Sequence, residues 1–168
     1  MCRSPTWLAS LRPFRYLPVM ATIWFYQLLR SGLEDELPRL LEMTQARGKR
    51  AVVMAGSPER VEALTQHLWT YRDDSFLPHG NAKDGSPAEQ PIWLTEADEN
   101  PNGAAYLFLT DGAVSEKLDD YERCHDMFDG RDPQALAAAR ARWKALKEAG
   151  HELAYWRQKD QGGWEKAA

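Results

Sequence analysis

The stretch RAVVMAGSPERVEALTQHLW, residues 50 to 69, holds a complete strand-to-helix unit and decides the fold class. Its first six residues form a short apolar run, which is typical of a strand buried on both faces. Ser57 and Pro58 then suit a helix start, because a serine side chain accepts a backbone N–H and proline needs no N–H in the first turn. Three apolar residues follow on one helical face: Val61, Leu64 and Leu68. The unit predicts a buried strand followed by an amphipathic helix.

A second unit of the same kind precedes this one. Residues 21 to 29, ATIWFYQLL, are rich in β-branched and aromatic residues and predict a strand. Residues 33 to 48 predict a helix that ends at Gly48, and we expect Pro38 in its first turn. The apolar residues of this helix have helical spacing: Leu33, Leu37, Leu40, Leu41 and Met43. The first half of the chain therefore predicts the order β-α-β-α.

The alternation continues toward the C-terminus. A helix is predicted from Asp132 as its N-cap, through Pro133, to Gly150 as its stop. Further strands are predicted at four places: 92 to 95, 104 to 110, 121 to 129 and 151 to 156. Strands that alternate with helices predict a three-layer α/β domain with a mostly parallel sheet.

Length and composition indicate one globular domain. The chain has 168 residues, of which 43% are hydrophobic, and this is enough to bury one core. Residues 1 to 19 hold three arginines, three prolines and no acid, and we expect an unstructured N-terminal extension there. We expect the single α/β domain over residues 20 to 157 and a flexible C-terminal tail over residues 158 to 168.

Cysteine usage, apolar runs and net charge indicate the compartment and the classes of partner. Cys2 and Cys124 lie far apart, which suits a reducing compartment, and we expect the cytoplasm. No run of eighteen apolar residues occurs in the sequence, so we expect no membrane partner. The net charge of −4 gives no overall attraction to phosphate, which disfavours a protein that binds single-stranded DNA directly.

The segment HLWTYRDDSFLPHG, residues 67 to 80, concentrates residue types that occur in metal and catalytic sites. Its histidines and aspartates do not recur three or four residues apart, as ligands on one helical face would. Elsewhere, Cys124 and His125 are adjacent on a predicted strand and so face opposite ways, and no serine lies in a Gly-x-Ser-x-Gly turn. We expect no metal site and no catalytic residue.

A nucleotide-utilising α/β enzyme with an unrecognised site is the alternative function. The first strand-to-helix turn, LLRSGLEDE, has one glycine and three acids, which would repel a pyrophosphate. The second turn, MAGSPER, has Gly56 and a helix N-terminus that could hold an anion, but it lacks the Gly-Lys-Ser/Thr ending of a phosphate loop. We therefore expect no cofactor.

Two aromatic residues of the 67 to 80 segment are more informative than its histidines. Trp69 ends the predicted helix and Phe76 follows in a short turn that also carries Arg72, Asp73 and Asp74. Core packing alone could explain either aromatic side chain. Both together, beside charged residues, are typical of an apolar anchor with a polar rim at a partner-binding surface.

Several segments, in this order and spacing, resemble the chi subunit of bacterial DNA polymerase III holoenzyme, a clamp-loader accessory protein. They are FYQL at 25 to 28, GKRAVVMA at 48 to 55, LW at 68 and 69, SFLPH at 75 to 79, and RARWKALKEAGHELAYW at 140 to 156. The resemblance covers residues 20 to about 156. The chain departs from the family in its first nineteen residues, in the loop after His79 and in its longer C-terminal tail.

The resemblance implies a Rossmann-like fold and an adaptor rather than an enzyme. Members of the family bind the psi subunit on one face and the acidic C-terminal tail of single-stranded DNA-binding protein on another. Such a protein links the clamp loader to coated template and meets DNA only indirectly. Trp69 and Phe76 match the aromatic residues of the face that binds psi or a helicase-type partner.

A basic stripe marks the second face. Residues 131 to 147 hold five basic residues and one acidic residue, a net charge of +4, whereas the whole chain is −4 and the remainder therefore −8. Arg140, Lys144 and Lys147 share one side of the predicted helix, and Trp143 adjoins it. A solvated amphipathic helix with Trp143 in the core is the plain alternative. The resemblance favours a site for a peptide with aspartates before an apolar C-terminal residue.

Overall fold

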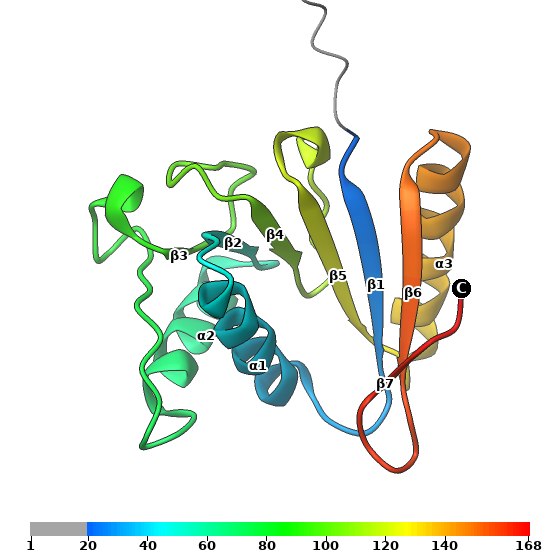
Figure 1. Cartoon of the computed structure of the whole chain (residues 1–168), viewed down its shortest axis with the longest axis horizontal. Helices are drawn as coiled ribbons and strands as arrows, with labels where there is room; N and C mark the ends of the chain where they lie inside the picture. The colour runs from blue at the N-terminus through cyan, green and yellow to red at the C-terminus, as the bar shows by residue number, and fades with distance from the viewer. Residues whose placement is uncertain (1–19) are drawn as a thin grey trace, which may run out of the picture.

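The computed structural model describes residues 20–168, and the predicted N-terminal extension at 1–19 lies outside the described residues. Three α-helices and seven β-strands follow one another along the chain (Figure 1). Their bounds are β1 Thr22–Leu28, α1 Leu33–Ala46, β2 Ala51–Met54, α2 Pro58–Thr70, β3 Ile92–Thr95, β4 Tyr106–Leu109, β5 Arg123–Asp129, α3 Pro133–Glu148, β6 Glu152–Gln158 and β7 Trp164–Lys166. The predicted strands and helices are thus confirmed, with shifts of a few residues at their ends.

All strands belong to one sheet in the order β3-β2-β4-β5-β1-β6-β7. Every neighbouring pair is parallel except β6 with β7, which is antiparallel. Helices α1 and α2 lie on one face of the sheet and α3 lies on the other (Figure 1). The prediction of a three-layer α/β domain with a mostly parallel sheet is confirmed.

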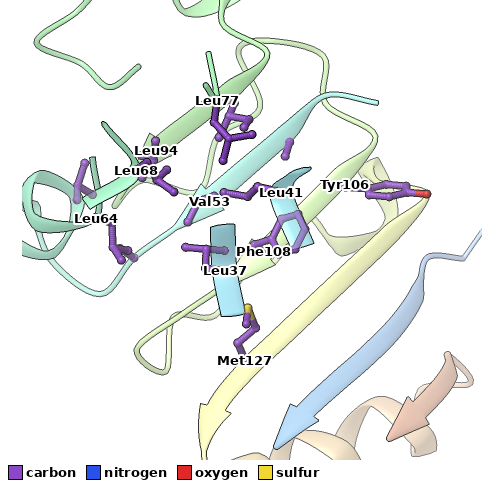
Figure 2. Close-up of a cluster of buried hydrophobic side chains, with 14 of the residues drawn as sticks. Leu37, Leu41, Val53, Leu64, Leu68, Leu77, Leu94, Tyr106, Phe108 and Met127 are labelled. Atoms are coloured by element: carbon purple, nitrogen blue, oxygen red, sulfur yellow. The ribbon is translucent and has the colours of Figure 1, made fainter. Parts of the chain in front are cut away.

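Two apolar cores lie on the opposite faces of the sheet. On the α1 and α2 face, leucines of both helices pack over side chains such as Val53 and Phe108 (Figure 2). On the α3 face, Ala139 packs over Phe25 and Leu107. The short strands β2, β3 and β4 are buried along their whole length, which explains their continuous apolar sequences.

The helices begin and end at or near the residues that the sequence predicts, and only the place of Pro38 within α1 differs. The Ser57 side chain accepts from the backbone N–H of Arg60 at 3.2 Å, and Asp132 accepts from that of Gln134 at 2.9 Å. Gly48 adopts a φ of +68° after α1, as expected of a residue that ends a helix. Pro38 does not lie in the first turn as predicted, because α1 already begins at Leu33 and places it in the second turn.

The position of Pro38 explains one of the histidines in the 67 to 80 segment. Proline has no N–H, so the carbonyl of Glu34, four residues earlier, lacks its helical donor. Nε2 of His67, on α2, lies 2.6 Å from that carbonyl oxygen. The imidazole therefore satisfies the backbone of α1 and joins the two helices.

The prediction of a flexible tail over residues 158 to 168 is wrong. The chain turns at Gly162 and Gly163, both with positive φ, and β7 returns antiparallel to β6. The ring of Trp164 packs edge-on against Tyr26, 5.1 Å between centroids, while Arg157 pairs with Glu165 at 2.7 Å. Trp164 packs on the core, whereas the short strand that holds it has no alternating apolar pattern, so sequence alone does not indicate it.

His125 is buried on β5 and stacks on Phe108, with 4.2 Å between ring centroids and 6° between planes. Its Nδ1 lies 3.2 Å from the carbonyl oxygen of Leu107. The neighbouring Cys124 belongs to the core on the other face, which confirms that the two side chains point in opposite directions. Burial lowers the pKa of His125 to about 3, so its imidazole is neutral in the folded protein at neutral pH.

We expect His125 to make the protein acid-sensitive. The pKa is near 6.5 in the unfolded chain and lower in the fold, so the unfolded state binds the proton more tightly and stability is lost as pH falls. Between about pH 6 and pH 4 this group should lower the free energy of unfolding by about 1.4 kcal/mol per pH unit. Urea unfolding of the wild type and of His125→Phe across this range measures the difference, and parallel pH dependences of the two proteins would contradict the prediction.

Candidate functional site

Helix α3 carries three cations without acidic partners. Arg140, Lys144 and Lys147 are exposed, and within residues 20–168 no carboxylate lies within 4.0 Å of their charged nitrogens. Other arginines of the segment are paired: Arg131 with Asp129 at 2.9 Å, and Arg142 with Asp126 at 2.7 Å. The positive charge that remains available on α3 is therefore confined to the predicted stripe.

The ion pair of Arg142 fixes the orientation of α3. Asp126 is buried on β5 and accepts from Nε and Nη2 of Arg142 at 2.7 and 2.9 Å. Burial raises the pKa of Asp126, and the guanidinium opposes that rise. Because this bidentate pair holds one flank of the helix against the sheet, the flank with Arg140 and Lys144 faces solvent.

Trp143 is half-buried between the stripe and the sheet. Its ring makes edge contacts with Phe25, 5.3 Å between centroids, and with Tyr155, 5.6 Å between centroids. The side chain thus packs on the core, as the plain amphipathic alternative expects, and it also lines a surface hollow. Trp143 therefore fits both the core-packing interpretation and the binding interpretation.

The hollow next to Trp143 has a volume of about 330 Å³. It is lined by Gln27, Arg140, Trp143, Tyr155, Arg157 and Ala168. The Tyr155 hydroxyl donates to Oε1 of Gln27 at 3.0 Å, and burial raises the pKa of this phenol although Arg140 and Arg157 oppose the rise. An aromatic floor with guanidinium groups nearby suits an anionic group attached to an apolar one.

The structure brings together only part of the predicted set. Arg140 and Trp143 line the hollow, whereas Lys144 and Lys147 do not line it and lie on exposed turns of the same helix. Sequence reasoning missed Tyr155 and Arg157 on β6. The alternation of the strand puts both side chains on one face, but nothing local indicates that β6 pairs with β1 beside α3.

Trp69 and Phe76 form a second candidate surface at the end of α2. Their side chains are 47% and 69% exposed, with ring centroids 6.1 Å apart, so they are not core residues. The buried Leu68 and Leu77 beside them fill the core positions. An exposed pair of large aromatic side chains favours the anchor interpretation over core packing.

Side-chain contacts hold the turn that carries Trp69 and Phe76 against its neighbouring helices. His79 is buried, its ring centroid is 4.4 Å from that of Trp69, and its Nε2 lies 3.0 Å from the carbonyl oxygen of Thr65. Tyr71 and Ser75 donate to Glu42 on α1 and lower the pKa of its carboxyl. The turn is thus attached to two helices while its aromatic rings face outward.

A crevice of about 450 Å³ lies at the carboxyl ends of the central strands, where α/β folds commonly bind nucleotides. Its arginines are already neutralised, since Arg60 contacts Glu34 and Asp111 at 3.1 Å each. A Cβ on Gly56 would come within 3.3 Å of Asp111, so this glycine serves close packing of the chain itself. A phosphate entering here would meet carboxylates, which disfavours a nucleotide site.

Residues 20–168 also bear on metal binding and on membrane insertion. No group of three or more His, Cys, Asp or Glu side chains there is arranged to hold a metal ion. Among the helices of this part of the chain, none combines the length and apolar character needed to cross a membrane.

Comparison with known proteins identifies the family of the chain. The model of the family "DNA polymerase III chi subunit, HolC" matches residues 20–154. A relative from Rickettsia prowazekii (strain Madrid E), described as a probable DNA polymerase III subunit chi, is 37% identical over 71 residues. That match spans 42% of this chain and 43% of the relative. Because the family model covers most of the sequence, the chain belongs to the DNA polymerase III chi subunit family.

Proposed function

We propose that this protein is a non-catalytic adaptor of DNA replication, which links the clamp loader of DNA polymerase III to single-stranded DNA-binding protein. Its central contact would be the acidic C-terminal tail of that protein, bound beside α3. One observation carries the proposal: unpaired cations flank a half-buried tryptophan and a 330 Å³ hollow on a chain of net charge −4. Isolated positive charge next to an apolar hollow is complementary to an acidic peptide with an apolar end.

Residues at and beside the hollow would recognise different parts of the peptide. The forked guanidinium of Arg140 would hold the terminal carboxylate with two charge-assisted hydrogen bonds. Trp143 and Tyr155 would pack against the apolar terminal side chain. Lys144 and Lys147, on the following turns, would meet the preceding aspartates without fixed geometry, as flexible ammonium groups do.

A second partner would bind the surface formed by Trp69 and Phe76. This partner would be the psi subunit, another clamp-loader protein or a helicase-type protein. These side chains lie by α2 and the β3 half of the sheet, whereas the hollow lies by α3 and β6 at the other end (Figure 1). Two partners could therefore bind at once without overlap, which is what an adaptor requires.

The alternatives are less well supported. A nucleotide-utilising enzyme would need a phosphate site, yet the arginines of the crevice at the strand ends are paired with carboxylates. A protein that binds single-stranded DNA directly would need an extended basic path, whereas the unpaired cations of α3 form one short stripe.

We expect Arg140→Ala to weaken binding of a peptide with several aspartates before an apolar C-terminal residue by about tenfold or more, since a charge-assisted pair contributes about 1.5 to 3 kcal/mol. Fluorescence anisotropy at low salt measures the affinity, and an amidated peptide should bind the wild type as weakly. Arg131→Ala is the matched control, because it removes the same charge outside the hollow. Equal binding of the free-acid and amidated peptides would refute the carboxylate site.

Alanine substitution of Trp69 or Phe76 should abolish binding of the second partner, because a buried aromatic anchor commonly contributes about 2 kcal/mol or more. The melting temperature should change little, since both side chains are largely exposed in the free protein. Acidic-peptide binding at α3 should survive. Pull-down of recombinant psi, calorimetry and the peptide assay test the three statements, and unfolding of both variants would instead assign these residues to the core.

A further inference from the structure

Among residues 20–168, no helix covers one half of the sheet on the α1 face. Helices α1 and α2 lie over the part of the sheet around β2 and β4, and in Figure 1 no helix lies in front of β1 and β6. On the opposite face, α3 covers these two strands. Parallel sheets are normally covered on both faces, because their strands expose apolar side chains in both directions.

Aromatic side chains occupy the uncovered half. The ring centroid of Trp24 is 5.5 Å from that of Trp156 on β6 and 6.4 Å from that of Tyr26. Trp164 of β7 packs edge-on against Tyr26 at 5.1 Å. The three tryptophans are each only partly buried, so the cluster presents an apolar aromatic surface to solvent.

This surface forms a groove between α1 and β7, which we name the aromatic groove. Its volume is about 350 Å³. It is lined by Trp24, Tyr26, Glu36, Arg39, Leu40, Met43, Trp156, Gly163 and Trp164. Met43 lies on the α1 side of the groove and is 53% exposed. A methionine of this helix would be expected to pack against a neighbour.

One arginine, Arg39, lines the aromatic groove, and two more, Arg47 and Arg123, line a small cavity that adjoins it. The Arg39 side chain is 70% exposed, and its contact with Glu36 is a long one of 3.4 Å. Arg47 and Arg123 have no carboxylate within 4.0 Å in the described part of the chain, and the Arg123 guanidinium lies 4.0 Å from the ring centroid of Trp24. Glu36 offsets the charge of Arg39, so the positive charge at this edge of the groove comes from Arg47 and Arg123, while the chain as a whole is negative.

A donor on the groove lining is also unused. Nε1 of Trp156 is buried and has no hydrogen-bond acceptor among residues 20–168. An indole N–H normally finds a partner when it is buried. Because this nitrogen is buried, a ligand in the groove would change its surroundings rather than bond to it directly.

We infer that the aromatic groove is a docking site for an amphipathic helix of a partner protein, with aliphatic side chains on one face and carboxylates along its flanks. A helix in this position would lie beside α1 and complete the helical layer over β1 and β6. Its apolar face would cover Met43 and the tryptophans, and its carboxylates would meet Arg39 and Arg47. This site is distinct from the hollow at α3, which lies on the other face of the sheet, and from the Trp69 surface.

Two other occupants fit less well. Residues 1–19 contain three arginines and no acid, so they would bring positive charge to the positive edge of the groove. A second copy of the chain, packed groove to groove, would oppose the same arginines to one another. Charge complementarity therefore selects an acidic partner.

A synthetic helical peptide of about five turns, with leucines on one face and glutamates on both flanks, is the probe for this site. Calorimetry with the full chain should show saturable binding, and a peptide with lysines in place of the glutamates should bind about tenfold more weakly or worse. In nitrogen-15 spectra the indole N–H resonance of Trp156, assigned with Trp156→Phe, should shift on binding of the acidic peptide.

Substitution at the rim tests the location. Met43→Glu should weaken binding of the acidic peptide about tenfold or more, because it places a like charge at the groove. Val114→Glu is the matched control, since Val114 is 62% exposed and does not line the groove, and it should leave the affinity unchanged. Arg39→Glu should reverse the preference between the acidic and basic peptides.

Three outcomes would overturn the inference. They are absence of saturable binding by the acidic peptide, equal weakening by Met43→Glu and Val114→Glu, and an indole resonance of Trp156 that does not respond. Binding of oligothymidylate to the groove in place of either peptide would assign the tryptophans to base stacking instead. The aspartate-rich peptide assay at α3 should be unaffected by Met43→Glu, so a failure here is distinguishable from a failure of the adaptor function.

Discussion

The structure depends on the insertion of β1 between β5 and β6. Phe25 pairs in register with Asp126 on one side and with Tyr155 on the other, so β1 meets two segments that each lie a long way from it in the sequence. Successive side chains of β1 point to opposite faces of the sheet. Phe25 faces α3 and supports Trp143, while Trp24 faces the α1 side and forms the aromatic groove. Both candidate surfaces of this half of the molecule follow from that one pairing.

Ion pairing decides which positive charges are available for binding. The arginines at the carboxyl ends of the strands are held by Glu34, Asp111, Asp126 and Asp129, and these pairs serve the fold. Within residues 20–168, Arg140, Lys144 and Lys147 on α3 have no such partners, so their charge is available to a ligand. Net charge alone would not separate the two groups, because it counts paired and unpaired arginines equally.

The arrangement suits a member of the chi subunit family whose proposed work is to join other proteins. The Trp69 surface and the α3 hollow lie at opposite ends of the sheet, and each combines partly exposed aromatic side chains with charged neighbours. The family comparison covers residues 20–154, whereas β7 begins at Trp164. The strand that borders the aromatic groove, and Ala168 after it at the hollow, therefore lie beyond the matched part of the chain.

Local signals were enough to predict the α/β order, the starts of α2 and α3 at Ser57 and Asp132, and the basic stripe, because caps, periodicity and charge act within a few residues. Three contacts could be found only in the folded chain: β7 joins the sheet, Tyr155 lies beside Trp143, and His67 satisfies the carbonyl left free by Pro38. These contacts join distant segments, and their partners are selected by strand pairing and helix packing, which leave no local pattern in the sequence.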